Sequence, residues 1–323
     1  MGVKRILNNK WVTYSIIGII TFVVLICVFT PEIIFFKRIA NYTFHIMFGL
    51  LLLGLIFLVL SQKKLVLACF FASGLLSFFL KNSSHYQLQL ATDTGLPGIS
   101  VAIINLADII TSSDSVVLYI QKLHPDVVLF NELTPDWTNY LSESLHQYYP
   151  HQVSLTRIDN YGKATFSHFP ILKADTLIYK NIPHLYTQIL IGPSVHIGVI
   201  NTYFNPPLVK HMILSYNEQL EFLLDHLPKN SEPFLTGGDF NLPPWSTELR
   251  AFKYTSYLHD SRRDITLRSG KGIESFLKVP VQHIFYNDNL ECTKFANFYD
   301  GSNTKIGIIG QYQVKPKTHG NPD

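Results

Sequence analysis

EPFLTGGDFNLPPWS, residues 232–246, is the stretch that decides the fold. Its apolar start predicts a buried strand that stops at Gly237 and Gly238, where backbone crowding leaves no room for a side chain. Asp239 and Asn241 follow two apart in extended chain, so we expect both side chains on one side of the strand end. An acid and an amide held side by side can orient a water and stabilise a phosphoryl oxygen. An Asp-Phe-Asn turn ahead of a Pro-Pro loop would account for the same residues without any chemistry.

The apolar residues of the chain are concentrated at its amino terminus. Of 323 residues, 47% are hydrophobic and only 15% are charged. Trp11–Thr30 and Ile39–Gln62 carry no Asp, Glu, Lys or Arg, and both are long enough to cross a bilayer. Leu65–Leu80 is shorter, but the lysines that flank it can reach the membrane interfaces. We therefore predict a membrane anchor over residues 1–81 with three transmembrane helices, rather than a cleaved signal peptide, because no small-residue cleavage pattern follows the first run.

Basic residues predict how this anchor is oriented. Lys4, Arg5 and Lys10 precede the first span, and Lys63 and Lys64 lie in the second loop. The positive-inside rule places these residues in the cytoplasm. Three crossings then leave the carboxyl-terminal domain on the extracytoplasmic side, which in a Gram-negative cell is the periplasm. If the short third run is only re-entrant, the domain is cytoplasmic instead.

The charge of the part after the anchor limits its partners. Seven of the 26 Lys and Arg residues and one of the 23 Asp and Glu residues precede residue 81. The remainder carries a net charge of −3 with His neutral, because 19 basic residues face 22 acidic ones. A domain that binds long nucleic acid usually has a basic surface, so we do not expect that partner. Cys292 is the single cysteine after the anchor, which excludes an internal disulfide there.

The rest of the chain divides into a polar linker, residues 82–98, and one domain of ordinary size, residues 99–323. Runs of β-branched residues alternate with segments of helical spacing, and polar residues follow several of the runs. This pattern is typical of an α/β sandwich of two sheets flanked by helices. The predicted strands are 99–105, 127–130, 163–167, 171–178, 186–191 and 195–203, and the predicted helices are 114–122, 137–148 and 211–226.

Three motifs in a fixed order resemble a known superfamily. They are PDVVLFNE at 125–132, GVINTY at 198–203 and GDFN at 238–241. Together they resemble the endonuclease/exonuclease/phosphatase superfamily, also called DNase I-like, and the resemblance covers roughly residues 99–314. PPWS at 243–246 and the anchor resemble its bacterial inner-membrane members. The resemblance implies a four-layer α/β-sandwich preceded by transmembrane helices, and hydrolysis of phosphoester bonds with Mg²⁺ or Mn²⁺.

The resemblance also assigns roles to residues. Glu132 matches the carboxylate that binds the metal, and Asn105 matches the amide that helps to hold the metal and phosphate site. Asp239 matches the residue that orients or deprotonates the attacking water, and Asn241 matches its support. Tyr203 stands where many members have His and some have Tyr, and it could donate a hydrogen bond to a phosphate oxygen. A solvated acid at Glu132 and a half-buried aromatic at Tyr203 are the alternatives without function.

Three positions in the last third depart from the family. Gln282 replaces an Asp, Asn303 replaces a metal-side Asp, and Thr304 replaces the catalytic His. Thr304 cannot carry a proton charge, and removal of one such stabilising group typically lowers the rate about a hundredfold or more. His283 or Lys305 could substitute.

Two functions therefore remain open from the sequence. The first is a membrane-anchored, metal-dependent hydrolase of small or lipid-borne phosphoesters with an altered site. The second is an inactive relative that binds a phosphorylated ligand, a lipid headgroup or a protein partner. The retained residues favour the first function, and the three substituted positions favour the second.

Overall fold

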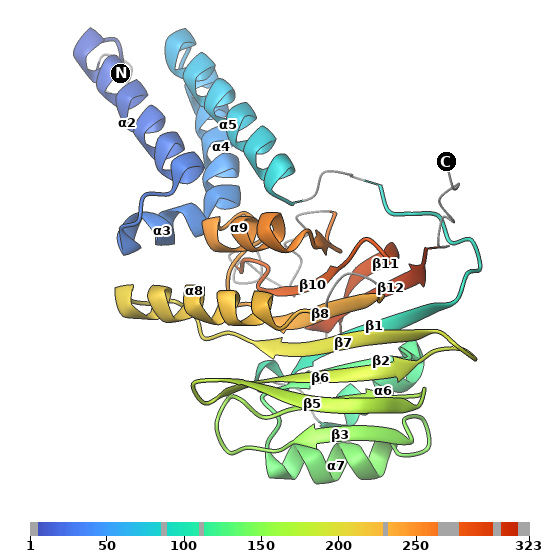
Figure 1. The fold of residues 1–323 in the computed structure, drawn as a ribbon. Helices are drawn as coiled ribbons and strands as arrows, with labels where there is room; N and C mark the ends of the chain where they lie inside the picture. Colours follow the sequence, from blue (N-terminus) through green and yellow to red (C-terminus); the bar gives the residue numbers. More distant parts are fainter. Residues whose placement is uncertain are drawn as a thin grey trace, which may run out of the picture.

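The computed structural model describes residues 6–84, 89–109, 113–228, 232–263, 278–299 and 305–315. Two mixed sheets face each other, helices cover their outer faces, and a group of apolar helices stands at one end of this sandwich (Figure 1). The domain is thus the α/β-sandwich that the sequence predicts.

The first sheet, sheet A, has a parallel pair at its centre. Strands β1 and β2 run parallel, with Asn105 opposite Asn131 at their ends. The remaining pairs in this sheet are antiparallel. In spatial order, sheet A consists of β11 (Leu290–Tyr299), β12 (Lys305–Val314), β1 (Gly98–Asn105), β2 (Val127–Asn131), β4 (Lys163–Ser167) and β3 (His151–Leu155).

Sheet B repeats this arrangement. Strands β7 and β8 are its parallel pair, with Tyr203 opposite Asp239 at their ends. Strand β10 then pairs antiparallel with β8, which places Gln282 opposite Asp239. In spatial order, sheet B consists of β5 (Ile171–Tyr179), β6 (Ile182–Leu190), β7 (His196–Tyr203), β8 (Phe234–Asp239), β10 (Gln282–Tyr286) and β9 (His259–Asp260).

Three apolar clusters hold these layers together. One lies between the two sheets and includes Ile103, Leu129 and Val199. A second packs the outer face of sheet A against α6 (Ser113–Leu123) and α7 (Pro135–Leu145). The third packs the outer face of sheet B against α8 (Lys210–Asp225) and α9 (Thr247–Ser256). A helix–sheet–sheet–helix order results, which makes four layers.

Two of the amino-terminal helices are long and apolar enough to cross a membrane. They are α2 (Lys10–Phe29) and α5 (Lys63–Ser84). The predicted middle span, Ile39–Gln62, is not one straight helix, because α3 (Ile34–Asn41) and α4 (Thr43–Val59) meet at a 66° bend. If this bent pair counts as one span, the described residues hold up to three.

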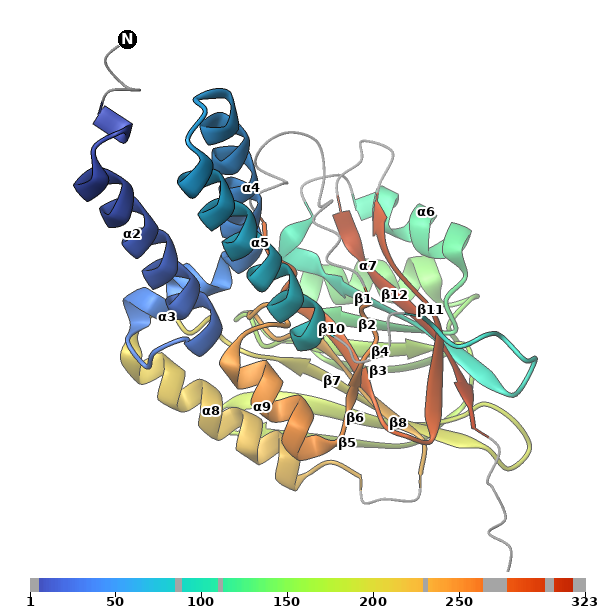
Figure 2. The same cartoon turned by 90° about the horizontal axis from the view of Figure 1, so that it is seen from above.

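The bend follows from contacts that α3 makes with the domain. The indole Nε1 of Trp245 donates to the carbonyl oxygens of Ala40 and Asn41, at 3.1 and 3.2 Å. The Lys37 ammonium lies 2.6 Å from a carboxylate oxygen of Glu248, and both side chains are buried. Helix α3 therefore lies against α8 and α9 rather than in line with α4 (Figure 2).

Trp245 belongs to the 232–246 stretch, and its packing accounts for part of that motif. It is 2% exposed and forms a cluster with Phe44 and Leu80, which come from α4 and α5. The Lys253 ammonium donates to the carbonyl oxygen of Ser83, at 2.6 Å, and so joins α9 to the end of α5. The segment that leaves the candidate site thus fastens the domain to the apolar helices.

Two local predictions around residue 239 are wrong. Strand β8 does not stop at the glycines but continues through Gly237 and Gly238 to Asp239. Crowding is nevertheless the reason for the glycine, because a Cβ at Gly238 would overlap the carbonyl oxygen of Thr202 on β7. The chain after Asp239 is not extended either, since Asn241 has a left-handed backbone with φ of 53°.

Candidate active site

The polar strand ends of both sheets meet between the sheets. Asn105 ends β1, Glu132 follows β2, Tyr203 ends β7 and Asp239 ends β8. Because the two strands of a parallel pair end at the same edge, each sheet brings two of these residues together. The structure therefore places four of the predicted site residues at one edge of the sandwich.

Asn105 connects the two acids of this group. Its Nδ2 donates to Oε1 of Glu132 and to Oδ2 of Asp239, at 2.9 Å in both cases. Its Oδ1 accepts the backbone N–H of Ala107, which fixes the orientation of the amide. One amide nitrogen thus holds two carboxylates from opposite sheets at a common point, and a carboxylate can accept several hydrogen bonds at once.

Asp239 is fixed from a second side by a residue to which none of the sequence motifs assigns a role. Nδ2 of Asn131 lies 3.2 Å from Oδ2 of Asp239 and also 3.2 Å from the carbonyl oxygen of Thr202. Asp239 is 2% exposed. A buried carboxylate that accepts two amide hydrogen bonds keeps one defined position, as a group that orients a water must.

Glu132 has an unusual backbone. Its φ of 57° lies in the left-handed region, which costs a residue with a side chain roughly 1–3 kcal/mol. The following residue pins this conformation, since the N–H of Leu133 donates to the carbonyl of Gly162 at 2.9 Å. The turn directs the Glu132 side chain back to Asn105. Strain maintained in this way is common at functional sites.

Tyr203 lies beside the two acids and is 4% exposed. Burial raises the pKa of its phenol, and the negative charges of Glu132 and Asp239 raise it further. The hydroxyl therefore keeps its proton and remains a hydrogen-bond donor at neutral pH. This environment differs from the half-buried aromatic that was the alternative interpretation.

Lys163 is a second residue near the acids that the sequence motifs do not indicate. It begins β4 opposite Asn131, is fully buried, and its Nζ has no hydrogen-bond partner within the described residues. Its neighbour Ala164 packs outward against the helices of sheet A, so strand alternation turns Lys163 toward sheet B. Burial lowers the pKa of the ammonium to about 7, although the charge of Asp239 opposes this shift.

Asn241 does not contact Asp239 through any hydrogen bond that the structure shows. Its Nδ2 donates to the carbonyl oxygen of Phe204, at 2.6 Å, and this bond closes the turn after β8. The carbonyl of Asp239 in turn accepts the N–H of Phe204, at 2.8 Å. Asn241 therefore fixes the backbone on which Asp239 stands.

A comparison of the sequence with models of protein families identifies the family of this chain. The model of the Endonuclease/Exonuclease/phosphatase family matches residues 105–303, which is more than half of the chain. The chain belongs to this family. The match begins at Asn105, the residue that links the two acids.

Solved structures share the fold of this endonuclease/exonuclease/phosphatase domain. An endonuclease/exonuclease/phosphatase from Beutenbergia cavernae matches with a TM-score of 0.54 and 17% identity, over 68% of this chain and 72% of that chain. TDP2 from D. rerio, complexed with a single strand DNA product, matches with a TM-score of 0.53 and 15% identity, over 69% and 100%. A family protein from Bacteroides thetaiotaomicron matches with a TM-score of 0.53 and 13% identity, over 68% and 98%. Comparison with curated protein sequences gives no match.

Of the three positions at which the sequence predicts a departure from the family, the structure describes Gln282. Asn303 and Thr304 lie outside the described residues. Gln282 lies opposite Asp239, and its Oε1 accepts a hydrogen bond from Nζ of Lys305 at 2.7 Å. The Lys305 ammonium is thus held beside the strand pair that carries Asp239.

His283, which the sequence suggests as a substitute for the catalytic His, belongs to β10. It is fully buried and faces away from Gln282, since adjacent residues of a strand point to opposite faces. Its Nε2 lies 2.9 Å from the carbonyl oxygen of Leu242, and its Nδ1 lies 3.6 Å from a carboxylate oxygen of Asp260. Burial lowers its pKa, and the imidazole packs against Phe240 and Phe285 outside the site.

Members of the family generally depend on a divalent metal ion, and the donors at this site fit one. Within the described residues no three His, Cys, Asp or Glu side chains cluster. Glu132 and Asp239 supply carboxylate oxygens, which Mg²⁺ prefers, and Mg²⁺ commonly keeps several waters beside one or two carboxylates. The oxygen of Asn105 accepts the N–H of Ala107, and its nitrogen donates to both carboxylates and so orients them.

Proposed function

We propose that this protein is a membrane-anchored, divalent-metal-dependent phosphoester hydrolase of low turnover. The proposal rests on the two hydrogen bonds that Asn105 donates to Glu132 and Asp239. These bonds hold two carboxylates from opposite sheets close together. A metal held at Glu132 would neutralise charge on a phosphoryl oxygen. Asp239 would accept a proton from, or orient, the attacking water, and the Tyr203 hydroxyl would donate to a phosphate oxygen.

The low turnover follows from the substituted positions. The family imidazolium stabilises charge in the transition state, and Thr304 cannot do so. Lys305, which is bonded to Gln282, supports the proposal because it brings a positive charge close to the site. An ammonium is a compact point charge, however, and does not donate a proton as an imidazolium does near neutral pH.

The substrate class follows from charge and from the anchor. The part of the chain after the anchor carries a net charge of −3, which disfavours long nucleic acid. We propose small or lipid-borne phosphoesters as substrates. TDP2, the structural neighbour with a bound DNA product, shares the fold at 15% identity only, so its ligand does not transfer.

Turnover by the full chain in detergent tests this function. With Mn²⁺ or Mg²⁺ present we expect slow hydrolysis of bis(p-nitrophenyl) phosphate and of a glycerophosphodiester, abolished by a chelator. Asp239→Asn should lower the rate about a hundredfold or more. Asp175→Asn, which changes an exposed carboxylate on β5, serves as the matched control and should leave the rate unchanged. Turnover that survives Asp239→Asn would contradict the assigned roles.

A second candidate, an inactive relative that binds a phosphorylated ligand, is favoured by the Lys305–Gln282 bond. Where the family has an acid, this chain has a neutral amide that accepts a lysine, an arrangement suited to holding an anion. Under this function the full chain would bind a phosphomonoester in the presence of metal without any turnover. Asp239→Asn would then leave binding nearly intact.

For the anchor we propose three spans, with the bent pair of α3 and α4 as the second. The amino terminus then lies in the cytoplasm of a bacterial cell and the domain lies outside the inner membrane. A periplasm-dependent reporter fused after Asp323 should be active. Strong activity of a cytoplasm-dependent reporter at the same place would show an even number of crossings.

A further inference from the structure

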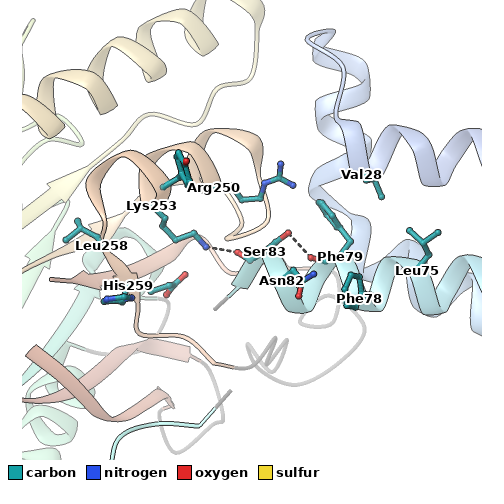
Figure 3. Close-up of a pocket in the computed structure, with 12 residues that line it drawn as sticks. Val28, Leu75, Phe78, Phe79, Asn82, Ser83, Arg250, Lys253, Leu258 and His259 are labelled. Carbon is teal, nitrogen blue, oxygen red and sulfur yellow. Dashed lines mark hydrogen bonds between the residues drawn. The ribbon is translucent and has the colours of Figure 1, made fainter. Parts of the chain in front are cut away.

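A cavity of about 650 Å³ lies where the apolar helices meet the domain, on the outer side of sheet B and away from the acids of the site. This volume falls in the range of small-molecule sites, roughly 300–1,000 Å³. Figure 3 shows its two walls. Helix α5 and the end of α2 form one wall, and helix α9 with β9 forms the other.

The two walls differ in chemistry. Val28, Leu75 and Phe78 supply apolar surface from the helix ends. Arg250 and Lys253 supply positive charge from α9. A molecule that fills this cavity must therefore have an apolar part on the helix side and a negative charge on the domain side.

Arg250 supplies the free charge. Its guanidinium lies 5.2 Å from the centre of the Phe79 ring, and no carboxylate pairs with it within the part of the chain that the structure describes. Lys253 is engaged by the Ser83 carbonyl oxygen. Asp260, the acid that lines the cavity, is 1% exposed, lies near His283 and accepts the N–H of Arg262. The lining thus retains an unbalanced guanidinium, the group best shaped for a phosphate.

The position of the cavity along the helices indicates which kind of apolar molecule can reach it. It is lined by the last turns of α5 and by Val28 near the end of α2, where both helices reach the domain. Tyr254 and Tyr257, at the end of α9, are 85% and 79% exposed. Exposed tyrosines beside the ends of apolar helices are typical of the headgroup region of a bilayer.

We propose that this cavity binds an anionic glycerophospholipid, with its phosphate on Arg250 and the upper part of its acyl chains on Phe78, Leu75 and Val28. The site rests on the proposed membrane anchoring and is independent of the proposed hydrolysis. A bound lipid fills the junction, the place where the ends of α2 and α5 meet α9, and so stabilises the contact between α5 and α9. Apolar contact and charge-assisted hydrogen bonds at the phosphate are the two sources of affinity.

Binding is tested with the full chain in detergent micelles. Native mass spectrometry and the melting temperature are recorded while dioleoyl phosphatidylglycerol or dioleoyl phosphatidylcholine is added. We expect the anionic lipid to bind at one to one and to raise the melting temperature more than the zwitterionic lipid does. Arg250→Gln should weaken its binding roughly tenfold or more, as for a lost hydrogen bond to a charged group.

Matched variants separate the site from general charge effects. Lys173→Gln removes an exposed cation on β5, far from the anchor in Figure 1, and should bind the lipid as the natural chain does. Arg250→Lys keeps the charge and should retain part of the affinity. Phe78→Ala changes a side chain that is 64% exposed, so the fold survives, and it should weaken lipid binding without changing the preference for the anionic headgroup.

Three results would overturn the proposal. They are equal binding of the two lipids, unchanged affinity in Arg250→Gln, and full competition by soluble glycerol 3-phosphate, which would identify a site for free phosphoesters. The hydrolysis assay is run on the same variants. Weaker lipid binding with unchanged turnover in Arg250→Gln is the result expected of two independent sites. A natural chain that binds the anionic lipid but hydrolyses no phosphoester refutes only the hydrolysis, and a chain that turns over without preferring the anionic lipid refutes only the lipid site. A chain that stays in solution without detergent would refute the anchoring instead.

Discussion

Replacement of Lys163 by Met should stabilise the protein at neutral pH and change how stability depends on pH. Lys163 is fully buried, and its ammonium has no hydrogen-bond partner within the described residues. Burial lowers its pKa from 10.5 to about 7 in the folded chain. A buried charge without a partner costs free energy, and a Met side chain of similar length does not carry that cost.

The sign and size follow from proton linkage. Between pH 7 and 10.5 the unfolded chain holds the Lys163 proton and the folded chain does not, so the free energy of unfolding rises with pH. The whole shift corresponds to on the order of 5 kcal/mol at about 1.4 kcal/mol per unit. The part gained between pH 7 and 9 is about 2 kcal/mol. At about 2–4 °C per kcal/mol for a domain of this size, that part corresponds to about 4–8 °C.

Melting temperatures of the full chain in detergent at pH 7 and 9 measure this effect. Lys163→Met should melt above the natural chain at pH 7, and the difference should shrink by several degrees at pH 9. Lys173→Met, at an exposed lysine on β5, controls for the other groups that titrate in this range. Parallel pH profiles for the natural chain and Lys163→Met would refute the reasoning, because they would mean that the folded state keeps the lysine charged and solvated.

Three further predictions concern the site and the junction. Mn²⁺ or Mg²⁺ should raise the melting temperature, because an ion that binds only the folded chain stabilises it. Glu132→Ala should abolish this increase. An unchanged increase in the Glu132→Ala variant would place the metal elsewhere. The triple change Gln282→Asp, Asn303→Asp and Thr304→His should raise metal-dependent phosphodiester hydrolysis, and Asp239→Ala on that background should remove the gain. A triple variant that folds and binds metal but remains inert would favour the binding function. Trp245→Ala should lower the free energy of unfolding, measured with urea, by about 3–5 kcal/mol. Trp11→Ala is the control and should cost little, because that side chain is 84% exposed. Equal effects of the two changes would contradict the docking role of Trp245.

The sequence was most informative where strands are buried on both faces. A short, continuous apolar run such as Val127–Phe130, bounded by polar residues, is typical of a strand of this kind, and the strand there ends at Asn131 as the run predicts. The polar residues that follow these runs then locate the edge at which the site forms. The period of two along a strand also predicts that His283 points away from Gln282, as it does in β10.

What the sequence did not reveal depends on contacts between distant segments. Lys163 looks like a solvated residue at a strand start, and only its pairing with Asn131 and the second sheet above it bury the ammonium. Gly238 looks like a strand end, but the crowding comes from Thr202 on a neighbouring strand, so the strand continues. The bend before Thr43 likewise depends on Trp245, about 200 positions away in the chain.

The junction and the site share one piece of backbone. Asp239 ends β8, and only five residues separate it from Trp245, which is bonded to the carbonyls at the end of α3. Between them, Phe240 and Leu242 are buried in the core under α9, and Asn241 is bonded to Phe204. Packed and hydrogen-bonded side chains thus connect the Asp239 carboxylate to the end of α3 without a loose loop between them. The backbone that carries Asp239 is therefore joined to the apolar helices as well as to the sheets.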